Sequence, residues 1–377
     1  MPTLDTADID TDLSLFKYDD LEQLPAPYRD LDEDERAERI AAARAELGDD
    51  VMILGHNYQR REIVEYADFV GDSYELSTTA ADADASHVVF AGVTFMTESA
   101  DVITDADQTV HLPSMEASCP MAGMAEALQV DAAWAEITGA AGDRDVVPVT
   151  YMNSYADLKA FCADHGGLVC TSSNAADAME WAFDRGDIVL FLPDKHLGRN
   201  SAHELGLGDE VAEWDPWDPA GLDADAAAEA EVVLWDGYCQ VHERFSADHV
   251  AEVRSTHPDA DVVVHPECRR EVVEAADVVG STSTICDTVA AADPGETWAV
   301  GTEIHLVNHL SRWHPEVDVV PLCGEACMDC NAMRQIDPNY LTWILEELAA
   351  GRERNVVAVP ERERELAATA MERMLDL

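Results

Sequence analysis

The chain contains 377 residues, of which 77 are acidic and 23 are lysine or arginine, so its formal net charge is −54 at pH 7. Such a charge argues against a nucleic-acid-binding protein and against binding to anionic membranes, because both need a cationic surface. Hydrophobic residues make up 47% of the chain, an ordinary globular proportion, so a core of two or three domains can form beneath the acidic surface.

Residues 1–35 are acidic and weakly patterned, which predicts an N-terminal extension. They lack the basic-then-apolar layout of a secretory signal, and no segment reaches 18 consecutive apolar residues. We therefore expect a cytoplasmic protein. Residues 33–47 carry a helical pattern that ends at Gly48.

Beyond residue 50, short apolar runs alternate with helical patterns, which is typical of parallel α/β architecture. The alternation falls into three parts and predicts a weak internal triplication of a small α/β sandwich, with domains at 36–130, 131–208 and 231–338. The predicted strands are 51–54, 87–92 and 109–112, then 145–150, 168–170 and 187–192, then 231–235, 261–264, 278–279 and 298–300.

Two further segments flank or interrupt these domains. Residues 209–230 are acidic and alanine-rich, which predicts a linker or an inserted surface segment. Residues 339–377 predict two amphipathic helices around a short strand, packing back on the core.

Polar clusters follow almost every predicted strand. Ligands bind beyond the carboxyl ends of parallel strands, so these residues are the candidates for a site. Hydroxyl and amide side chains at helix N-termini are suited to anionic groups, and histidine and tyrosine supply acid/base capacity. Any single cluster is more often a helix cap or a structural hydrogen bond, but ten at the same topological position predict one shared site.

The nine cysteines have no dense regular spacing and argue against a disulfide framework. Cys323-x3-Cys327-x2-Cys330 indicates metal or redox chemistry, and its spacing matches the cluster loop of radical S-adenosylmethionine enzymes. That loop normally follows an early strand, whereas Cys323 lies near the end of the chain. A zinc-stabilised or redox-sensing binding protein is a non-enzymatic alternative, but it leaves the strand-end clusters unexplained.

Ten motifs occur in order along residues 50–340: GHNYQ, GDS, M-x-E-S, YMNS, CTSSNA, LPDKHLGRN, G-x-C-x-V-H, HPEC, GSTS and GTE. Together they resemble the quinolinate synthase (NadA) family. The resemblance implies an α/β fold of three pseudo-threefold-related α/β/α domains with short parallel sheets around a central iron–sulfur site. It implies a transferase that condenses iminoaspartate with dihydroxyacetone phosphate to quinolinate, phosphate and water in de novo NAD biosynthesis.

The family holds a [4Fe–4S] cluster with three cysteines, one from each domain. By resemblance these are Cys119, Cys239 and Cys330, which leaves Cys323 and Cys327 as a redox-sensitive pair or as spectators. Three protein ligands leave one iron open, and that iron can act as a Lewis acid in dehydration. The unstable imine implies a transient contact with the enzyme that produces it.

The resemblance also implies the residues of the pocket. Those expected to bind or orient the substrates are His56, Ser73, Tyr151, Met152, Asn153, Ser172, His265, Pro266, Glu267 and Thr282. Those expected to transfer protons are Tyr58, Tyr151, His265 and Glu267.

Lysine is scarce, with Lys17, Lys159 and Lys195 as the three present. Acid enrichment with lysine depletion resembles proteins of salt-in halophiles, because a Debye length of about 3 Å in molar salt screens the repulsion between surface charges. Lys195 and Arg199 are expected to offset negative charge near the pocket.

Overall fold

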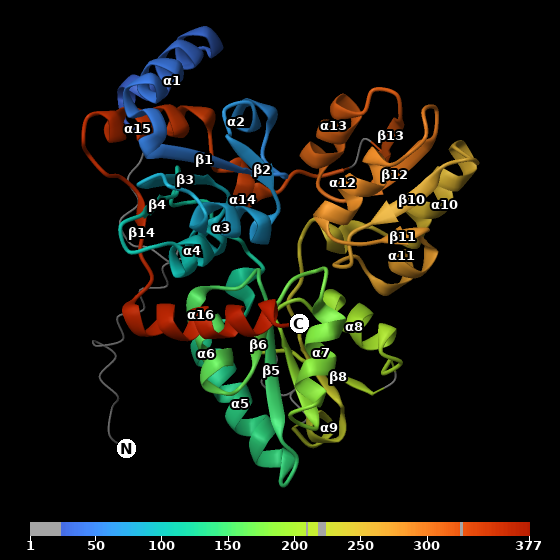
Figure 1. Ribbon diagram of the computed structural model, residues 1–377. Helices are drawn as coiled ribbons and strands as arrows, with labels where there is room; N and C mark the ends of the chain where they lie inside the picture. Colours follow the sequence, from blue (N-terminus) through green and yellow to red (C-terminus); the bar gives the residue numbers. More distant parts are fainter. Residues whose placement is uncertain (1–23, 209, 218–223, 325–326) are drawn as a thin grey trace, which may run out of the picture.

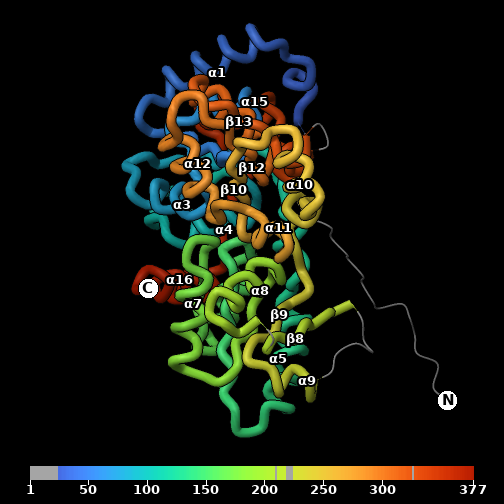
Figure 2. The backbone as a smooth tube through the Cα atoms, turned by 90° about the vertical axis from the view of Figure 1, so that its right-hand side faces the viewer, coloured from blue at the N-terminus to red at the C-terminus, as the bar shows by residue number. Residues whose placement is uncertain are grey.

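The structure is a computed structural model that describes residues 24–208, 210–217, 224–324 and 327–377. Three separate sheets, each flanked by helices, form three domains that meet at a common centre (Figure 1). The first and third domains lie next to each other, and the second extends away from both, as the turned view in Figure 2 also shows. The predicted α/β class with repeated, short and mostly parallel sheets is confirmed.

The first domain follows helix α1 (Glu33–Leu47), which begins where the Asp32 side chain accepts the N–H of Glu35 and ends at Gly48, where φ is 58°. This helix has the predicted bounds. The strands of the first domain are β1 (Val51–His56), β2 (Phe69–Gly71), β3 (His87–Ala91) and β4 (Thr109–His111). Its further helices are α2 (Arg61–Val64), α3 (Ser73–Ala81) and α4 (Thr94–Ile103).

The second domain contains five parallel strands, and its central strands β5 and β7 are buried along their whole length. The strands are β5 (Val146–Tyr151), β6 (Leu168–Cys170), β7 (Ile188–Leu192), β8 (Val211–Trp214) and β9 (Val232–Trp235). The helices are α5 (Ala127–Ala141), α6 (Ala156–Asp164), α7 (Ala175–Phe183), α8 (Lys195–Glu204) and α9 (Ala224–Glu229).

The third domain contains four parallel strands. They are β10 (Asp261–Val264), β11 (Val278–Val279), β12 (Thr297–Gly301) and β13 (Asp318–Pro321). The helices are α10 (Ala247–Thr256), α11 (Arg270–Ala275), α12 (Thr282–Ala290) and α13 (Ile304–Trp313). The short helix α14 (Asn331–Arg334) follows β13 in the chain, but its Ala332 and Met333 pack in the core of the first domain.

All three sheets share one strand order. Across each sheet the common core runs β2-β1-β3-β4, β6-β5-β7-β9 or β11-β10-β12-β13. In this order β4, β9 and β13 are the equivalent fourth strands, while β14 and β8 are additions beyond the fourth strand of the first and second sheets. Because the carboxyl ends of parallel strands form one edge of a sheet, equivalent loops of the three domains can converge on one place.

The C-terminal segment connects two domains. Helix α15 (Pro338–Ala349) packs on α1, and β14 (Val356–Val357) pairs antiparallel with β4. Helix α16 (Glu361–Leu375) then packs on α6 and β6 of the second domain (Figure 1). The predicted pair of helices around a short strand is therefore present.

One prediction about the middle of the chain is wrong. Strand β9 pairs with β7 and β8, so the segment at 231–235 closes the second domain and does not open the third. A second prediction is right in part: the described residues of 209–230 contain the helix α9, as expected for an insertion, but they also contain β8, a strand of the second sheet, and so do not form a linker. Apolar runs mark strands, but they do not specify which sheet a parallel strand joins, because its pairing partner is distant in sequence.

The remaining differences are smaller. Strands β2 and β13 are absent from the predicted set, and both are short. Of the predicted extension 1–35, residues 1–23 lie outside the described residues; beyond them, the Tyr28 hydroxyl donates to Glu346 Oε2 of α15 at 2.7 Å. Within the described residues, no helix is long and apolar enough to cross a bilayer.

Candidate active site

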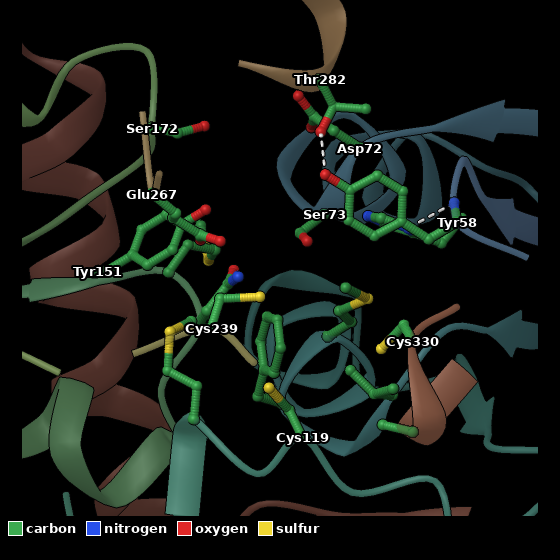
Figure 3. Close-up of a pocket in the computed structure, with 18 of the residues that line it drawn as sticks. Tyr58, Asp72, Ser73, Cys119, Tyr151, Ser172, Cys239, Glu267, Thr282 and Cys330 are labelled. Carbon is green, nitrogen blue, oxygen red and sulfur yellow. Dashed lines mark hydrogen bonds between the residues drawn. The ribbon is translucent and has the colours of Figure 1, made fainter. Parts of the chain in front are cut away.

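A pocket with about 710 Å³ of empty space is lined by residues from all three domains (Figure 3). The sequence-predicted site residues that line it are His56, Tyr58, Ser73, Cys119, Tyr151, Met152, Asn153, Ser172, Cys239, His265, Glu267, Thr282 and Cys330. Pro266 lines a neighbouring cavity that shares Ser172 with the pocket. The loop that contains Pro266 is fixed by two hydrogen bonds, in which Asn200 Nδ2 donates to the carbonyls of Pro266 and Cys268 at 2.8 and 2.9 Å.

Residues at equivalent positions of the three domains line the pocket. His56, Tyr151 and His265 stand at the ends of the first strands of their domains. Ser73, Ser172 and Thr282 follow the second strands, and Ser73 and Thr282 are the first residues of α3 and α12. This regularity explains why chemically different side chains from distant parts of the sequence reach one pocket.

The cysteines continue the same repeat. Cys119, Cys239 and Cys330 each follow the fourth strand of a domain and precede a short helical turn at Ala122–Met124, His242–Arg244 or Asn331–Arg334. Against the larger opposing effect of burial, the backbone N–H of the residue three positions further on lowers the pKa of each thiol. Figure 3 shows the three side chains on one side of the pocket, facing a common space.

Burial controls the protonation of these thiols. It raises the pKa of Cys119 to about 12 and of Cys330 to about 11, and it raises the pKa of Cys239 well above its usual value. The thiols therefore stay protonated at neutral pH until a metal replaces the proton.

Buried carboxylates position two of the cysteine loops. Asp194, the N-cap of α8, accepts the backbone N–H of Cys239 on Oδ2 at 3.1 Å. Glu303, the N-cap of α13, accepts the backbone N–H of Cys330 on Oε1 at 3.1 Å. Both carboxylates follow the third strand of their domain and are fully buried, so each ties its cysteine loop to the equivalent place in the fold.

A chain of hydrogen bonds crosses the pocket wall. His242 Nδ1 lies 2.5 Å from Glu267 Oε2, and His242 Nε2 lies 3.0 Å from Thr302 Oγ1. Tyr58 Oη lies 2.7 Å from Thr302 Oγ1, and Thr282 Oγ1 donates to Tyr58 at 3.4 Å. The Glu267 carboxylate can only accept, so His242 Nδ1 carries the proton of that bond, and the Tyr58 hydroxyl, which accepts from Thr282, donates to Thr302.

The two carboxylate oxygens of Glu267 differ, because among the described residues Oε2 is hydrogen-bonded to His242 and Oε1 is not hydrogen-bonded. Its Oε1 is buried and has no hydrogen-bond partner within the described part of the chain. Burial favours a raised pKa, but the neighbouring His265, together with the charge and hydrogen bond of His242, lowers the pKa of Glu267 below its ordinary value. The group is thus an ionised carboxylate with a free oxygen, which can accept a proton.

The two tyrosines differ from Glu267 in protonation. Burial, followed by the nearby Glu267 charge, raises the pKa of Tyr58 and of Tyr151 well above 10. Both phenols are therefore neutral at pH 7 and can donate a hydrogen bond. Figure 3 shows Tyr151 beside Glu267 and Tyr58 across the pocket, so a molecule between them would face donors and an acceptor from opposite walls.

Some residues of the site are absent from the predicted set. Four of them lie within the quoted motifs and form hydrogen bonds to side chains or backbone groups of the site: His242, Thr302, Asp194 and Glu303. Their spacing alone does not show this, because each partner comes from another part of the chain. Asp72 lines the pocket and accepts from Ser283 Oγ at 2.8 Å, which joins the first and third domains.

The expected cations are not in the pocket. Lys195 pairs with Asp236 at 2.6 Å, and Arg199 pairs with Glu213. Among the described residues, no lysine or arginine lines the pocket. Hydroxyls, amides and helix N-termini are therefore the groups that can bind an anion there.

Cys323 and Cys327 form a disulfide with a Cα–Cα distance of 5.1 Å. Neither lines the pocket, whereas Cys330 does, three residues further on. The local cluster of three cysteines is therefore divided between a disulfide and the pocket.

Acid should destabilise the protein partly through His56. Burial lowers its pKa from 6.5 to about 4, so below pH 6.5 the unfolded state binds more protons than the folded state. The stabilising contribution is complete above pH 6.5 and is lost as the pH falls toward 4. Between pH 6.5 and 5 we expect a loss of about 2 kcal/mol that His56→Asn does not show.

Denaturant titrations of metal-free protein at pH 6.5 and pH 5 measure this effect. The exposed His257→Asn is the matched control and should keep the parent's acid sensitivity. Equal acid losses in His56→Asn and the parent would assign the effect to other groups.

The chain matches known proteins over nearly its whole length. The family model described as Quinolinate synthetase A protein matches residues 38–376. Quinolinate synthases of Halobacterium salinarum and Haloarcula marismortui are 74% and 72% identical to the chain over 374 residues, covering 99% of this chain and 100% of each relative. Quinolinate synthase of Acidobacterium capsulatum is 49% identical over 355 residues, covering 93% of this chain and 95% of that relative.

Proposed function

The chain belongs to the quinolinate synthase family of NAD biosynthesis, and we propose that it condenses iminoaspartate with dihydroxyacetone phosphate to quinolinate, phosphate and water. The pocket is lined by side chains from all three domains, with polar groups among apolar ones, as is typical of small-molecule sites. Its walls combine neutral donors with one ionised carboxylate. These features support a reaction between two small anions that requires several proton transfers.

Cys119, Cys239 and Cys330 are the residues that would hold a [4Fe–4S] cluster. They come from equivalent positions of three domains, and all three line the same pocket. Bound by three thiolates, such a cluster supplies one iron that has no protein ligand and can act as a Lewis acid in dehydration.

Substrate anions are held by groups without formal charge. Ser73 and Thr282 are the first residues of α3 and α12, so their hydroxyls can donate to a carboxylate or phosphate whose charge the helix dipoles favour. Asp72 and Ser281 already cap N–H groups of the following residues. Ser172 and His56 extend this surface from the other strand ends, and burial keeps His56 neutral. Tyr151 and Asn153, with Met152 between them, orient the intermediate against the opposite wall.

Glu267 is the proposed base. Glu267 lines the pocket and its Oε1 has no hydrogen-bond partner among the described residues, so it can remove a proton during tautomerisation and ring closure and return it during loss of water. His265 lies beside it, and burial lowers the pKa of His265 to about 3, so the neutral imidazole can accept or relay that proton. Tyr58 donates from the other wall.

One observation carries this proposal: a cysteine follows the fourth strand of every domain, and all three line the pocket that contains Glu267. The radical S-adenosylmethionine alternative is not supported, because two of its three cysteines are joined in a disulfide and the family match covers nearly the whole chain.

The test is anaerobic turnover of iminoaspartate and dihydroxyacetone phosphate in high potassium chloride, assayed for quinolinate. We expect turnover that depends on both substrates and on bound iron. Low salt should reduce turnover, because unscreened acidic side chains repel one another and repel anionic substrates. Protein with a full complement of iron that forms no quinolinate would overturn the proposal.

The cellular setting is part of the proposal. A surface with a net charge of −54 suits a high-salt cytoplasm. The instability of iminoaspartate favours a transient contact with the enzyme that supplies it.

A further inference from the structure

A second cluster of metal-ligating side chains lies outside the pocket, on strands β3 and β4 of the first sheet and in the loop before β14. We propose that His87, His111 and Glu353 form a binding site for a divalent transition metal of the zinc class. His87 begins β3, His111 ends β4, and Glu353 lies in the loop that leads to β14. Their ligand atoms all lie within 4.8 Å of one another. The inference is independent of the proposed reaction.

The two imidazoles already have the spacing of a metal pair. His87 Nδ1 and His111 Nε2 are 3.2 Å apart. Nitrogen ligands at 2.0–2.1 Å from a tetrahedral zinc ion are about 3.3 Å from each other. A metal could therefore bind both nitrogens with little movement of either ring.

The tautomer of His111 favours this role. Its Nδ1 lies 2.8 Å from the carbonyl oxygen of Arg354, which can only accept, so Nδ1 carries the proton and Nε2 presents a lone pair. A second ring nitrogen that donates to a carbonyl is the arrangement that orients metal-binding histidines. His111 is fully buried, so its lone pair has a fixed direction toward His87.

His87 has two available states. In the structure, its Nδ1 can donate to His111 Nε2. A metal between them requires the proton of His87 to move from Nδ1 to Nε2, which changes the tautomer without changing the charge. Metal binding would thus replace one hydrogen bond by two coordination bonds.

Glu353 completes the set with an oxygen. Its Oε1 lies 3.9 Å from His87 Nδ1 and accepts from Thr109 Oγ1 at 3.3 Å. The carboxylate lowers the cost of bringing a cation to the histidines, and its half-exposed position admits water as a fourth ligand. Two nitrogens and one oxygen without sulfur favour Zn²⁺, Co²⁺ or Ni²⁺ over Cu⁺.

The consequence of binding is structural. The site joins β3 and β4 to the loop before β14, and the segment after β14 continues into α16 on the second domain. A bound metal should therefore stabilise the attachment of the C-terminal segment to the first sheet.

Equilibrium dialysis of iron-loaded protein against zinc, in high potassium chloride, tests the proposal. Zinc and iron are counted on the same samples, so that displacement of iron is detected. The variants are His87→Gln and Glu353→Gln, both of which alter partly exposed side chains. The matched control is His314→Gln: His314 and Glu316 form a similar surface pair, 23% and 48% exposed against 24% and 52% for His87 and Glu353, but without a second histidine.

We expect one zinc per chain in the parent and in His314→Gln, and at least tenfold weaker binding in both His87→Gln and Glu353→Gln. Zinc should also slow hydrogen exchange of the β14 amides in the parent and not in His87→Gln. A parent that binds no zinc would overturn the proposal. Zinc bound equally well by His87→Gln, with unchanged exchange in β14, would also overturn it, because the metal would then occupy thiols or scattered carboxylates.

Discussion

Replacing Cys239 by Ser is expected to abolish both the iron–sulfur absorbance and quinolinate formation in anaerobically prepared protein. Cys239 follows β9, and its loop is held by Asp194, so no other described cysteine can take its place without rebuilding the loop. A cluster with two remaining thiolates should be lost during purification. The same result is expected for Cys119→Ser and Cys330→Ser, because the three positions are equivalent. Iron content, visible absorbance and turnover measure the effect.

The matched control is the neighbouring disulfide. Cys323→Ser should retain iron and turnover, because Cys323 lies outside the pocket although it is close to Cys330 in sequence. Loss of iron in Cys323→Ser together with full iron in Cys119→Ser would place the metal on the local cysteine cluster and would contradict the proposed site.

The second large effect is expected for Glu267→Gln, which should lower turnover by about 10²–10⁴-fold while iron content stays unchanged. Glutamine keeps the shape of the side chain and can still contact His242, but it cannot accept a proton at the position of Oε1. The loss should therefore appear mainly in kcat, with a smaller change in KM. Steady-state kinetics with iron analysis measure both quantities.

A carboxylate outside the pocket is the control for this substitution. Glu316→Gln removes a carboxylate that lies 3.8 Å from His314 on the surface, and it should leave kcat unchanged. Normal turnover by Glu267→Gln with a full complement of iron would show that Glu267 is not the base, and the role would then pass to His265 or Tyr58.

Local patterns predicted much of the fold. Helix α1 has its predicted bounds, because a capping aspartate and a terminal glycine mark its ends within a few residues. The apolar runs at β1, β5, β7 and β10 also coincide with strands. Strand β9 shows the limit: its apolar run identifies it as a strand, but pairing with β7 rather than with the third sheet depends on residues over 40 positions away.

The residues of the candidate site, like the strands, could be predicted from the sequence only in part. Tyr151 and Thr282 follow predicted strands, and parallel strands place such residues at a common edge. Ser73 is expected from the family resemblance, because the strand before it, β2, is absent from the predicted set. His242 could not be assigned a partner, because its contacts to Glu267 and Thr302 span 25 and 60 residues. The cations expected from the DKHLGRN loop are paired with acids elsewhere, which their position in the sequence does not reveal.

The sequence by itself determined the net charge, the repeated α/β pattern and the chemical types of the strand-end residues, since these depend on composition and on neighbours along the chain. The tertiary structure alone decided which strands share a sheet, which of the cysteines face the pocket, and that His87 and His111 lie 3.2 Å apart. These features depend on the convergence of three domains and of adjacent strands. Such distances are set by packing between residues far apart in sequence, and no local pattern records them.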